Sequence, residues 1–393
     1  MNTFTFYTPT EIVFGKDTEA KVAELTKKHG GTRVLIVYGG GSVKKSGLLD
    51  RVEETLKAAD IPFAEFGGVQ PNPRLSHARE GVKAAAKFGA DLILAVGGGS
   101  VIDTSKAIAH GAADLSTDIW EYWSGSKTVA QSLPVGVILT ISAAGSETSN
   151  RAVLTNEETG KKCGINTDFN RPAFAIMNPE LTYTIPRRQL AAGIADIMMH
   201  TLDRYVTHEE GNEFTDRVAE ALLKNLIRFA KLAMTNHRDY QAMSEIMWCG
   251  SVSHNGFTSL GRTMDFGVHK LGHELSGFYD SIHGETLTTM WPAWARYVMM
   301  DKPERFAQYA ENVWGVCVGT PIERARAGIR ETEEFWHSLG LPLSFTELGI
   351  GIKDDAEIEK LADSLSANGT KKVAVFRPLG KEEAIAIYKL ANH

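Results

Sequence analysis

The first half of the chain alternates short apolar runs with segments of helical periodicity. The clearest apolar run, residues 34–38, is rich in β-branched residues and ends at three glycines, as expected of a buried strand. This alternation predicts right-handed crossovers and a parallel sheet covered by helices on both faces. Strands are predicted over residues 34–38, 63–66, 91–96 and 135–140, and helices over residues 47–59 and 77–88.

From about Pro186 onward the pattern changes to long segments of helical periodicity, and strand-like runs become scarce. The prolines Pro179 and Pro186 mark the boundary, because a residue before proline is disfavoured in a helix. We therefore predict an α/β region followed by an all-α region. The first is a parallel-sheet α/β domain over residues 1–185, and the second is a helical domain over residues 186–393. A ligand-binding cleft is expected between two such domains.

Composition and charge narrow the class of protein. The 393 residues are 43% hydrophobic and 23% charged, which is typical of globular proteins and excludes a disordered or collagen-like chain. The net charge of −6 without long like-charge runs gives no indication of nucleic-acid or membrane binding. The three cysteines are far apart, and no apolar run approaches the roughly 18 residues of a membrane span. We expect a cytoplasmic protein with reduced thiols that acts on small molecules.

The strongest local signal in the first half is a glycine-rich turn between a predicted strand and a helix. Glycine lets the backbone approach a phosphate closely, and a helix start offers free N–H groups. Such turns also occur without a ligand, but this one lies at the carboxyl end of a parallel strand, where open α/β sheets bind ligands. We predict a phosphate site here and include Asp103 of the following helix among the cofactor-binding candidates. The turn consists of Gly97, Gly98, Gly99 and Ser100.

A second glycine cluster ends the first predicted strand. Neither cluster spells the G-x-G-x-x-G fingerprint, so a standard Rossmann motif is not supported, although a dinucleotide remains compatible. No acidic residue follows this strand to bind a ribose 2′-hydroxyl, whereas a serine and two lysines, Lys44 and Lys45, suit a 2′-phosphate. Paired surface lysines are also often merely solvated. The pattern favours NADP(H) over NAD(H). The cluster consists of Gly39, Gly40, Gly41 and Ser42.

The helical half contains potential metal ligands in three short windows. Asp196 and His200 are spaced i, i+4 and so lie on one helix face, as do His269 and His273. His283 follows a segment whose glycine and aspartate predict a helix break before it. A carboxylate with imidazoles suits Fe(II) or Zn(II), but such pairs also stabilise helices without metal. A metal together with a nicotinamide cofactor would form a coherent alcohol dehydrogenase, in which the metal polarises the substrate oxygen.

These motifs, in this order and spacing, resemble the iron-containing (group III) alcohol dehydrogenases over essentially the whole chain. The resemblance also includes residues 145–147 and 178–182, and residues 38–45 are similar to the branch of bacterial NADPH-dependent butanol dehydrogenases and broad aldehyde reductases. It implies a homodimer in which each chain has a Rossmann-like, dinucleotide-binding domain over residues 1–185 and an all-helical, metal-binding domain over residues 186–393. It also implies that His273 lies beside the metal or relays a proton near the substrate. The implied metal ligands are Asp196, His200, His269 and His283.

The same resemblance assigns further cofactor contacts. It implies that Thr140 and Ser142 line the cofactor groove and that Lys162 approaches the ribose next to the nicotinamide. NAD-preferring relatives place Asp at the position of Gly39, so its absence here supports NADPH. The sequence departs from many relatives at two places, with Asn178 in place of Asp and with Ala143 and Ala144 in place of Gly and Thr. Neither departure removes an implied metal ligand.

The expected activity is hydride transfer between a nicotinamide and short to medium aliphatic alcohols or aldehydes, such as butanol and butyraldehyde. Two alternatives remain open at this point. The first is another reaction on the same architecture, as in polyol dehydrogenases of the glycerol type or dehydroquinate synthase, which typically bind metal through a different donor set. The second is a non-catalytic protein that binds a metal or a nucleotide.

Overall fold

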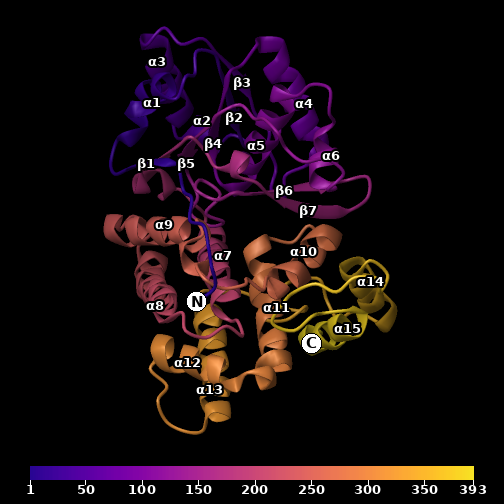
Figure 1. Cartoon of the computed structure of the whole chain (residues 1–393). Coiled ribbons are helices and arrows are strands. Elements are labelled where there is room, and N and C mark those ends of the chain that lie inside the picture. The colour runs from indigo at the N-terminus through magenta and orange to yellow at the C-terminus, as the bar shows by residue number, and fades with distance from the viewer. The chain divides into compact units, whose positions relative to one another are not determined.

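The computed structural model describes all 393 residues, and these form two compact units. Residues 7–185 form an α/β unit, and residues 186–393 form a helical unit that also includes residues 1–6. In Figure 1 the α/β unit is drawn in indigo to magenta and most of the helical unit in orange to yellow. No helix in the chain has both the length and the apolar character needed to cross a membrane.

Six parallel strands form the sheet of the α/β unit, in the order β1-β8-β5-β4-β2-β3. Strands β2 and β4 are buried along their whole length, which explains their continuous apolar sequences. The strand order reverses at β2, which pairs with β3 on one side and with β4 on the other. The strands are β1 (Glu11–Phe14), β2 (Val34–Tyr38), β3 (Phe63–Phe66), β4 (Leu92–Gly97), β5 (Val135–Leu139) and β8 (Phe174–Met177).

Helices cover both faces of this sheet (Figure 1). On one face, α1 and α3 pack their apolar residues against the strands, and Leu49 and Val52 of α3 meet Val34 and Ile36 of β2 in one core cluster. On the other face, α4, α5 and α6 share a second cluster. These helices are α1 (Val22–Lys28), α2 (Ser42–Lys45), α3 (Leu48–Ala58), α4 (Leu75–Phe88), α5 (Gly99–Ala113) and α6 (Ile119–Trp123), with 3-10 turns at Thr18–Lys21, Asp168–Asn170 and Pro179–Thr182.

The predicted fold class is confirmed, with elements that the sequence pattern did not reveal. An antiparallel hairpin joins β6 (Arg151–Asn156) and β7 (Lys161–Asn166). Three of the six residues of its second strand are exposed, and the strand has no apolar run, so periodicity gave no signal. The edge strand β1 and the strand β8 have four residues each and were not predicted, although β3, also of four residues, was.

The helical unit contains no strand, as predicted. Its central helix α7 is buried from Leu190 to Tyr205, so nearly every face of this helix packs against protein. Helix α11 begins at His283, where the sequence predicted a new helix. The helices are α7 (Arg187–Tyr205), α8 (Glu213–Thr235), α9 (Tyr240–His254), α10 (Gly267–Tyr279), α11 (His283–Val298), α12 (Pro303–Trp314), α13 (Pro321–Ser338), α14 (Asp355–Ser366) and α15 (Lys381–Ala391), with 3-10 turns at Phe257–Ser259 and Met299–Asp301.

Candidate active site

Three of the predicted cofactor-binding segments leave the sheet at the same edge. Tyr38 at the end of β2 pairs with Val96 of β4, and Gly97 pairs with Leu139 at the end of β5. The segments that follow these strands therefore start side by side at the carboxyl ends. The backbone N–H of Thr140 donates to the carbonyl of Gly97 at 3.1 Å. This edge includes the point between β2 and β4 where the strand order reverses, the usual ligand position in open α/β sheets.

The turn after β4 has the form of an anion site. Helix α5 begins at Gly99, with Gly98 as its N-cap, so the unpaired N–H groups of its first turn lie at the carboxyl end of β4. A β-carbon on Gly98 would lie 3.0 Å from Cβ of Ile141, so glycine permits close packing of the two loops. The hydroxyl of Ser142 is buried and has no hydrogen-bond partner in the protein. An unsatisfied buried hydroxyl at this edge fits a site that binds a polar ligand.

The turn after β2 is shaped by its third glycine. Gly41 has φ of 117°, a backbone conformation that favours glycine, and Ser42 then begins helix α2. The ammonium of Lys44 forms a 3.0 Å ion pair with Glu65 of β3 and lies over the ring of Tyr38. Part of the positive charge predicted for this turn is therefore already compensated by a carboxylate.

Asp103 contacts protein groups. Its two oxygens accept hydrogen bonds from the Ser146 hydroxyl at 2.6 Å and the Val153 N–H at 2.9 Å. The fully buried ammonium of Lys106 donates to the carbonyls of Ser146 and Arg151, each at 2.8 Å. Burial lowers the pKa of Lys106 to about 8 and raises that of Asp103. This pair connects α5 to residues 146–153 and so supports the loop at the sheet edge.

Lys162 lies on the β6–β7 hairpin. Its ammonium donates to the side-chain oxygen of Asn72 at 2.9 Å, in the loop between β3 and α4. The N–H of Thr155 donates to the carbonyl of Pro73, so the hairpin is joined to this loop by its backbone as well. Lys162 is thus placed by the hairpin, which periodicity did not predict.

In the helical unit, α7, α10 and α11 bring the predicted metal ligands together. The candidate ligand atoms of Asp196, His200 and His269 all lie within 4.8 Å of one another. Nε2 of His200 is 3.3 Å from Oδ1 of Asp196, and Nε2 of His269 is 3.7 Å from the same oxygen. His283, at the start of α11, places its Nε2 3.7 Å from Oδ1 of Asp196. The three predicted histidine ligands therefore surround one oxygen of the fourth predicted ligand, Asp196.

The residues present at this cluster fit a divalent metal. Oδ1 of Asp196 and Nε2 of His269 are buried and form no hydrogen bond, an arrangement that costs free energy unless something binds between them. Burial lowers the pKa of His200 well below its usual value, and nearby histidines and Arg204 lower it further. A neutral imidazole offers a lone pair, which is the form that binds a metal. One carboxylate and three imidazoles are donors suited to Fe(II) or Zn(II).

His273 lies beside this cluster. Its ring centroid is 5.2 Å from that of His283 and 6.2 Å from that of His269. Two neighbours of the cluster were not identified from the sequence. Asp203 bonds to Nδ1 of His269, and the ring of His254 stacks on His200 with centroids 3.9 Å apart. Asp203 follows Asp196 by seven positions on one helix face, a signal that was available, whereas His254 gave no local signal.

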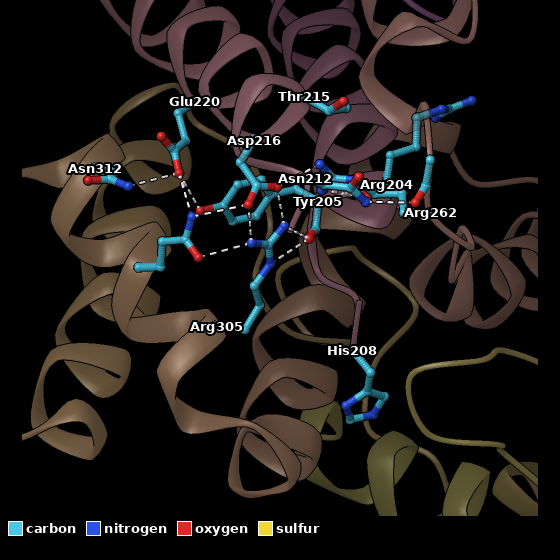
Figure 2. A network of polar contacts seen from close by, with 12 residues as sticks. Arg204, Tyr205, His208, Asn212, Thr215, Asp216, Glu220, Arg262, Arg305 and Asn312 are labelled. Carbon is cyan, nitrogen blue, oxygen red and sulfur yellow. Dashed lines mark hydrogen bonds and ion pairs between the residues drawn. The ribbon is translucent and has the colours of Figure 1, made fainter. Parts of the chain in front are cut away.

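A buried polar network holds the carboxyl end of α7, the helix that carries Asp196 and His200 (Figure 2). Arg305 donates to the carbonyl of Tyr205 at 2.8 Å and pairs with Asp216. Arg262 also pairs with Asp216, at 2.6 Å. The carboxyl end of a helix is a favourable place for cations, because its last carbonyls are unpaired and the helix dipole is negative there. The network therefore fixes the end of the helix that supplies two of the proposed ligands.

The comparison with known sequence families identifies the family of the chain. Residues 9–179 match the family described as iron-containing alcohol dehydrogenase, and residues 190–392 match the C-terminal part of that family. The chain belongs to the iron-containing alcohol dehydrogenase family and is an oxidoreductase of this class. The resemblance inferred from the motifs is confirmed.

Individual relatives cover nearly the whole chain. The NADH-dependent butanol dehydrogenase A of Clostridium acetobutylicum is 40% identical over 391 residues, 99% of each chain. The NADPH-dependent aldehyde reductase YqhD of Escherichia coli is 36% identical over 394 residues, 100% of each. The crystal structure of NADH-dependent butanol dehydrogenase A from Thermotoga maritima matches with a TM-score of 0.95 at 33% identity, covering 100% of this chain and 99% of the other. These relatives include enzymes named as NADH-dependent and one named as NADPH-dependent, so the comparison does not determine which cofactor this chain prefers.

Proposed function

We propose that the chain is a metal-dependent, NADPH-preferring reductase of short to medium aliphatic aldehydes, such as butyraldehyde, that also oxidises the corresponding alcohols. The metal, Fe(II) or Zn(II), would be held by Asp196, His200, His269 and His283. The observation that carries the proposal is the convergence of these donors on one carboxylate oxygen, with two buried donor atoms lacking hydrogen-bond partners.

The α/β unit would bind the dinucleotide at the carboxyl edge of its sheet. The first turn of α5 would hold the pyrophosphate, and Ser142 would donate to or accept from the cofactor through its unpaired hydroxyl. We assign the NADPH preference to the absence of an acid at Gly39 and to the hydroxyl and N–H groups at Ser42. Lys44, partly compensated by Glu65, would contribute less.

When bound, the metal supplies a Lewis acid that polarises the aldehyde oxygen. When bound, NADPH would supply the hydride for the carbonyl carbon and leave as NADP⁺, and the carbonyl oxygen would take up a proton to give the alcohol. We assign the relay of this proton to His273, because an imidazole both donates and accepts protons near neutral pH. Its position beside His283 at the cluster supports this role.

The substrate class, the oligomeric state and the location of the protein are proposed from the family and from the cysteines. The relatives named as butanol dehydrogenases and aldehyde reductase favour a monohydric substrate over a polyol. The family resemblance implies a homodimer. None of the cysteines Cys163, Cys249 and Cys317 forms a disulfide, which supports the reducing, cytoplasmic location expected from the sequence.

Two histidine substitutions test the assignment of roles. His269→Ala should abolish metal retention together with butyraldehyde-dependent oxidation of NADPH, because it removes a ligand. His273→Ala should retain the metal and lower kcat, because it removes only the proton relay. A His269→Ala protein that keeps both metal and turnover would contradict the ligand assignment, and loss of metal from His273→Ala would make His273 a ligand.

A further inference from the structure

We propose that Asp203 is a positioning residue for His269: its carboxylate fixes the imidazole so that the lone pair on Nε2 faces Asp196 and His200. The inference deepens the proposed metal-dependent function and rests on it. Neither the family description nor the sequence motifs assign a role to Asp203.

The geometry places the two nitrogens of His269 in opposite roles. Nδ1 forms a hydrogen bond with Oδ2 of Asp203, whereas Nε2 forms none and faces Oδ1 of Asp196 at 3.7 Å. The side chains of His269 and Asp203 are 3% and 1% exposed, so water does not compete for this bond. A carboxylate only accepts hydrogen bonds, so the ring hydrogen must be on Nδ1. The lone pair of the neutral ring is then on Nε2, the nitrogen that faces the other donors.

Asp203 also connects two helices at the point where the metal donors meet. Asp196, His200 and Asp203 lie on one face of α7 at intervals of four and three residues. The backbone carbonyl of Asp203 accepts a hydrogen bond from the N–H of Asp265 at 2.9 Å, just before α10 begins. Side chain and backbone of this one residue therefore hold the start of α10 against α7. His269 is in the first turn of α10, so these two bonds set both its ring orientation and its position.

Asp203→Asn tests the role of the carboxylate with little change in size. The amide can donate to Nδ1, which would move the ring hydrogen to Nε2 and block the lone pair that faces Asp196. We expect the affinity for Zn²⁺ to fall 10- to 100-fold, the usual effect of removing such a partner. Asp203→Glu keeps a carboxylate that only accepts hydrogen bonds, so its affinity should recover at least part of this loss.

Glu19→Gln is a control for the loss of a buried carboxylate, because Glu19 is buried in the α/β unit and not in the helical unit that carries His269. Its oxygens accept from the side-chain amide of Asn178 at 2.9 Å and pair with Arg51 at 3.4 Å. The substitution should lower the melting temperature of the metal-free protein while leaving zinc affinity within about threefold of wild type. The comparison separates loss of a buried negative charge from loss of the bond to the ligand.

The experiment is a competition titration of Zn²⁺ between a chelator and each purified protein, with the visible spectrum of the Co²⁺-loaded proteins as a second readout. The proposal predicts weaker zinc binding and an altered cobalt spectrum for Asp203→Asn, recovery with Asp203→Glu and no comparable change with Glu19→Gln. Wild-type affinity and spectrum in Asp203→Asn, or no recovery with Asp203→Glu, would overturn it. If His269→Ala bound Zn²⁺ as tightly as wild type, the proposed metal site itself would be wrong, which is a distinct outcome.

Discussion

Gly284 at the start of α11 packs directly against the backbone carbonyl of Ala192 in α7, so closely that a β-carbon on Gly284 would overlap that oxygen. Gly284 follows His283, and Ala192 lies one turn before Asp196 on the same helix. The close approach of the two backbones therefore brings a proposed ligand of α11 to the carboxylate of α7. The glycine is required here by packing, since it lies inside a helix and not in a turn.

Gly284→Ala should destabilise the protein and weaken metal retention. The added methyl group would meet a backbone atom that cannot rotate away, so we expect a loss of at least the about 1–3 kcal/mol typical of overpacking. Urea unfolding and metal analysis of the purified variant measure the two effects. Gly272→Ala in α10 is a matched control, because its β-carbon would meet the rotatable hydroxyl of Thr286 at 2.9 Å and should cost less. Equal stability of Gly284→Ala and wild type would contradict the packing argument.

Arg305→Met should be strongly destabilising because it leaves the buried carboxylate of Asp216 with one fewer cation and removes a donor from the end of α7. Removing one partner of a buried ion pair typically costs about 3–5 kcal/mol. Arg324→Met is the control, because its ion pair with Glu311 is partly exposed and should contribute less than about 1 kcal/mol. Chemical unfolding measures the loss in the free energy of unfolding for each variant. Similar losses for both variants would show that the network of Figure 2 does not hold α7.

His110 should make the stability of the protein depend on pH. Burial lowers the pKa of this imidazole to about 4 from its ordinary 6.5, and the ring bonds to Ser132 and Asn170. Below pH 6.5 the unfolded chain takes up a proton that the folded protein accepts only near pH 4. The stability contributed by the neutral ring is therefore complete above pH 6.5 and falls by about 3 kcal/mol as the pH drops to 4.

His110→Gln isolates this contribution, because the other titrating groups remain the same in both proteins. We expect the stability difference between wild type and variant to shrink by about 3 kcal/mol between pH 7 and pH 4. Urea unfolding at several pH values measures it. Stability curves that stay parallel across this range would show that His110 does not titrate with a lowered pKa.

Gly39→Asp should shift the cofactor preference from NADPH toward NADH. An acid at this position would accept from the ribose hydroxyls of NADH and repel a 2′-phosphate. A β-carbon on Gly39 would lie 3.5 Å from the carbonyl oxygen of Val69, an ordinary contact, so the position accommodates a side chain. The ratio of kcat/KM for the two cofactors should change in favour of NADH by tenfold or more. An unchanged ratio would place cofactor discrimination elsewhere.

The fold was largely predictable because its central elements are long or strongly apolar. The strand over residues 34–38 was predicted with both ends correct, and the helix predicted over residues 47–59 is α3, within one residue at each end. The strands β1 and β8 and the β6–β7 hairpin were not predicted. β1 and β8 pair with strands that are distant in the sequence, and local periodicity does not report such pairing.

The candidate site was predictable where chemistry and spacing coincide. Asp196 and His200 share a helix face by spacing alone, and the structure adds that His283 comes to the same oxygen. The residues that contact them were harder to predict from the sequence. His254 reaches His200 from another helix, and the tight contact of Gly284 follows from how two helices pack, which spacing along the chain does not contain.

The central claim is that one metal at the four-residue cluster is required for hydride transfer. The most direct measurement is metal content together with butyraldehyde-dependent oxidation of NADPH, before chelation, after chelation and after adding back Fe(II) or Zn(II) under anaerobic conditions. The account predicts about one metal ion per chain, loss of activity with the metal and recovery on addition. Full activity in the metal-free protein would contradict it and would leave the cluster a structural or acid–base role.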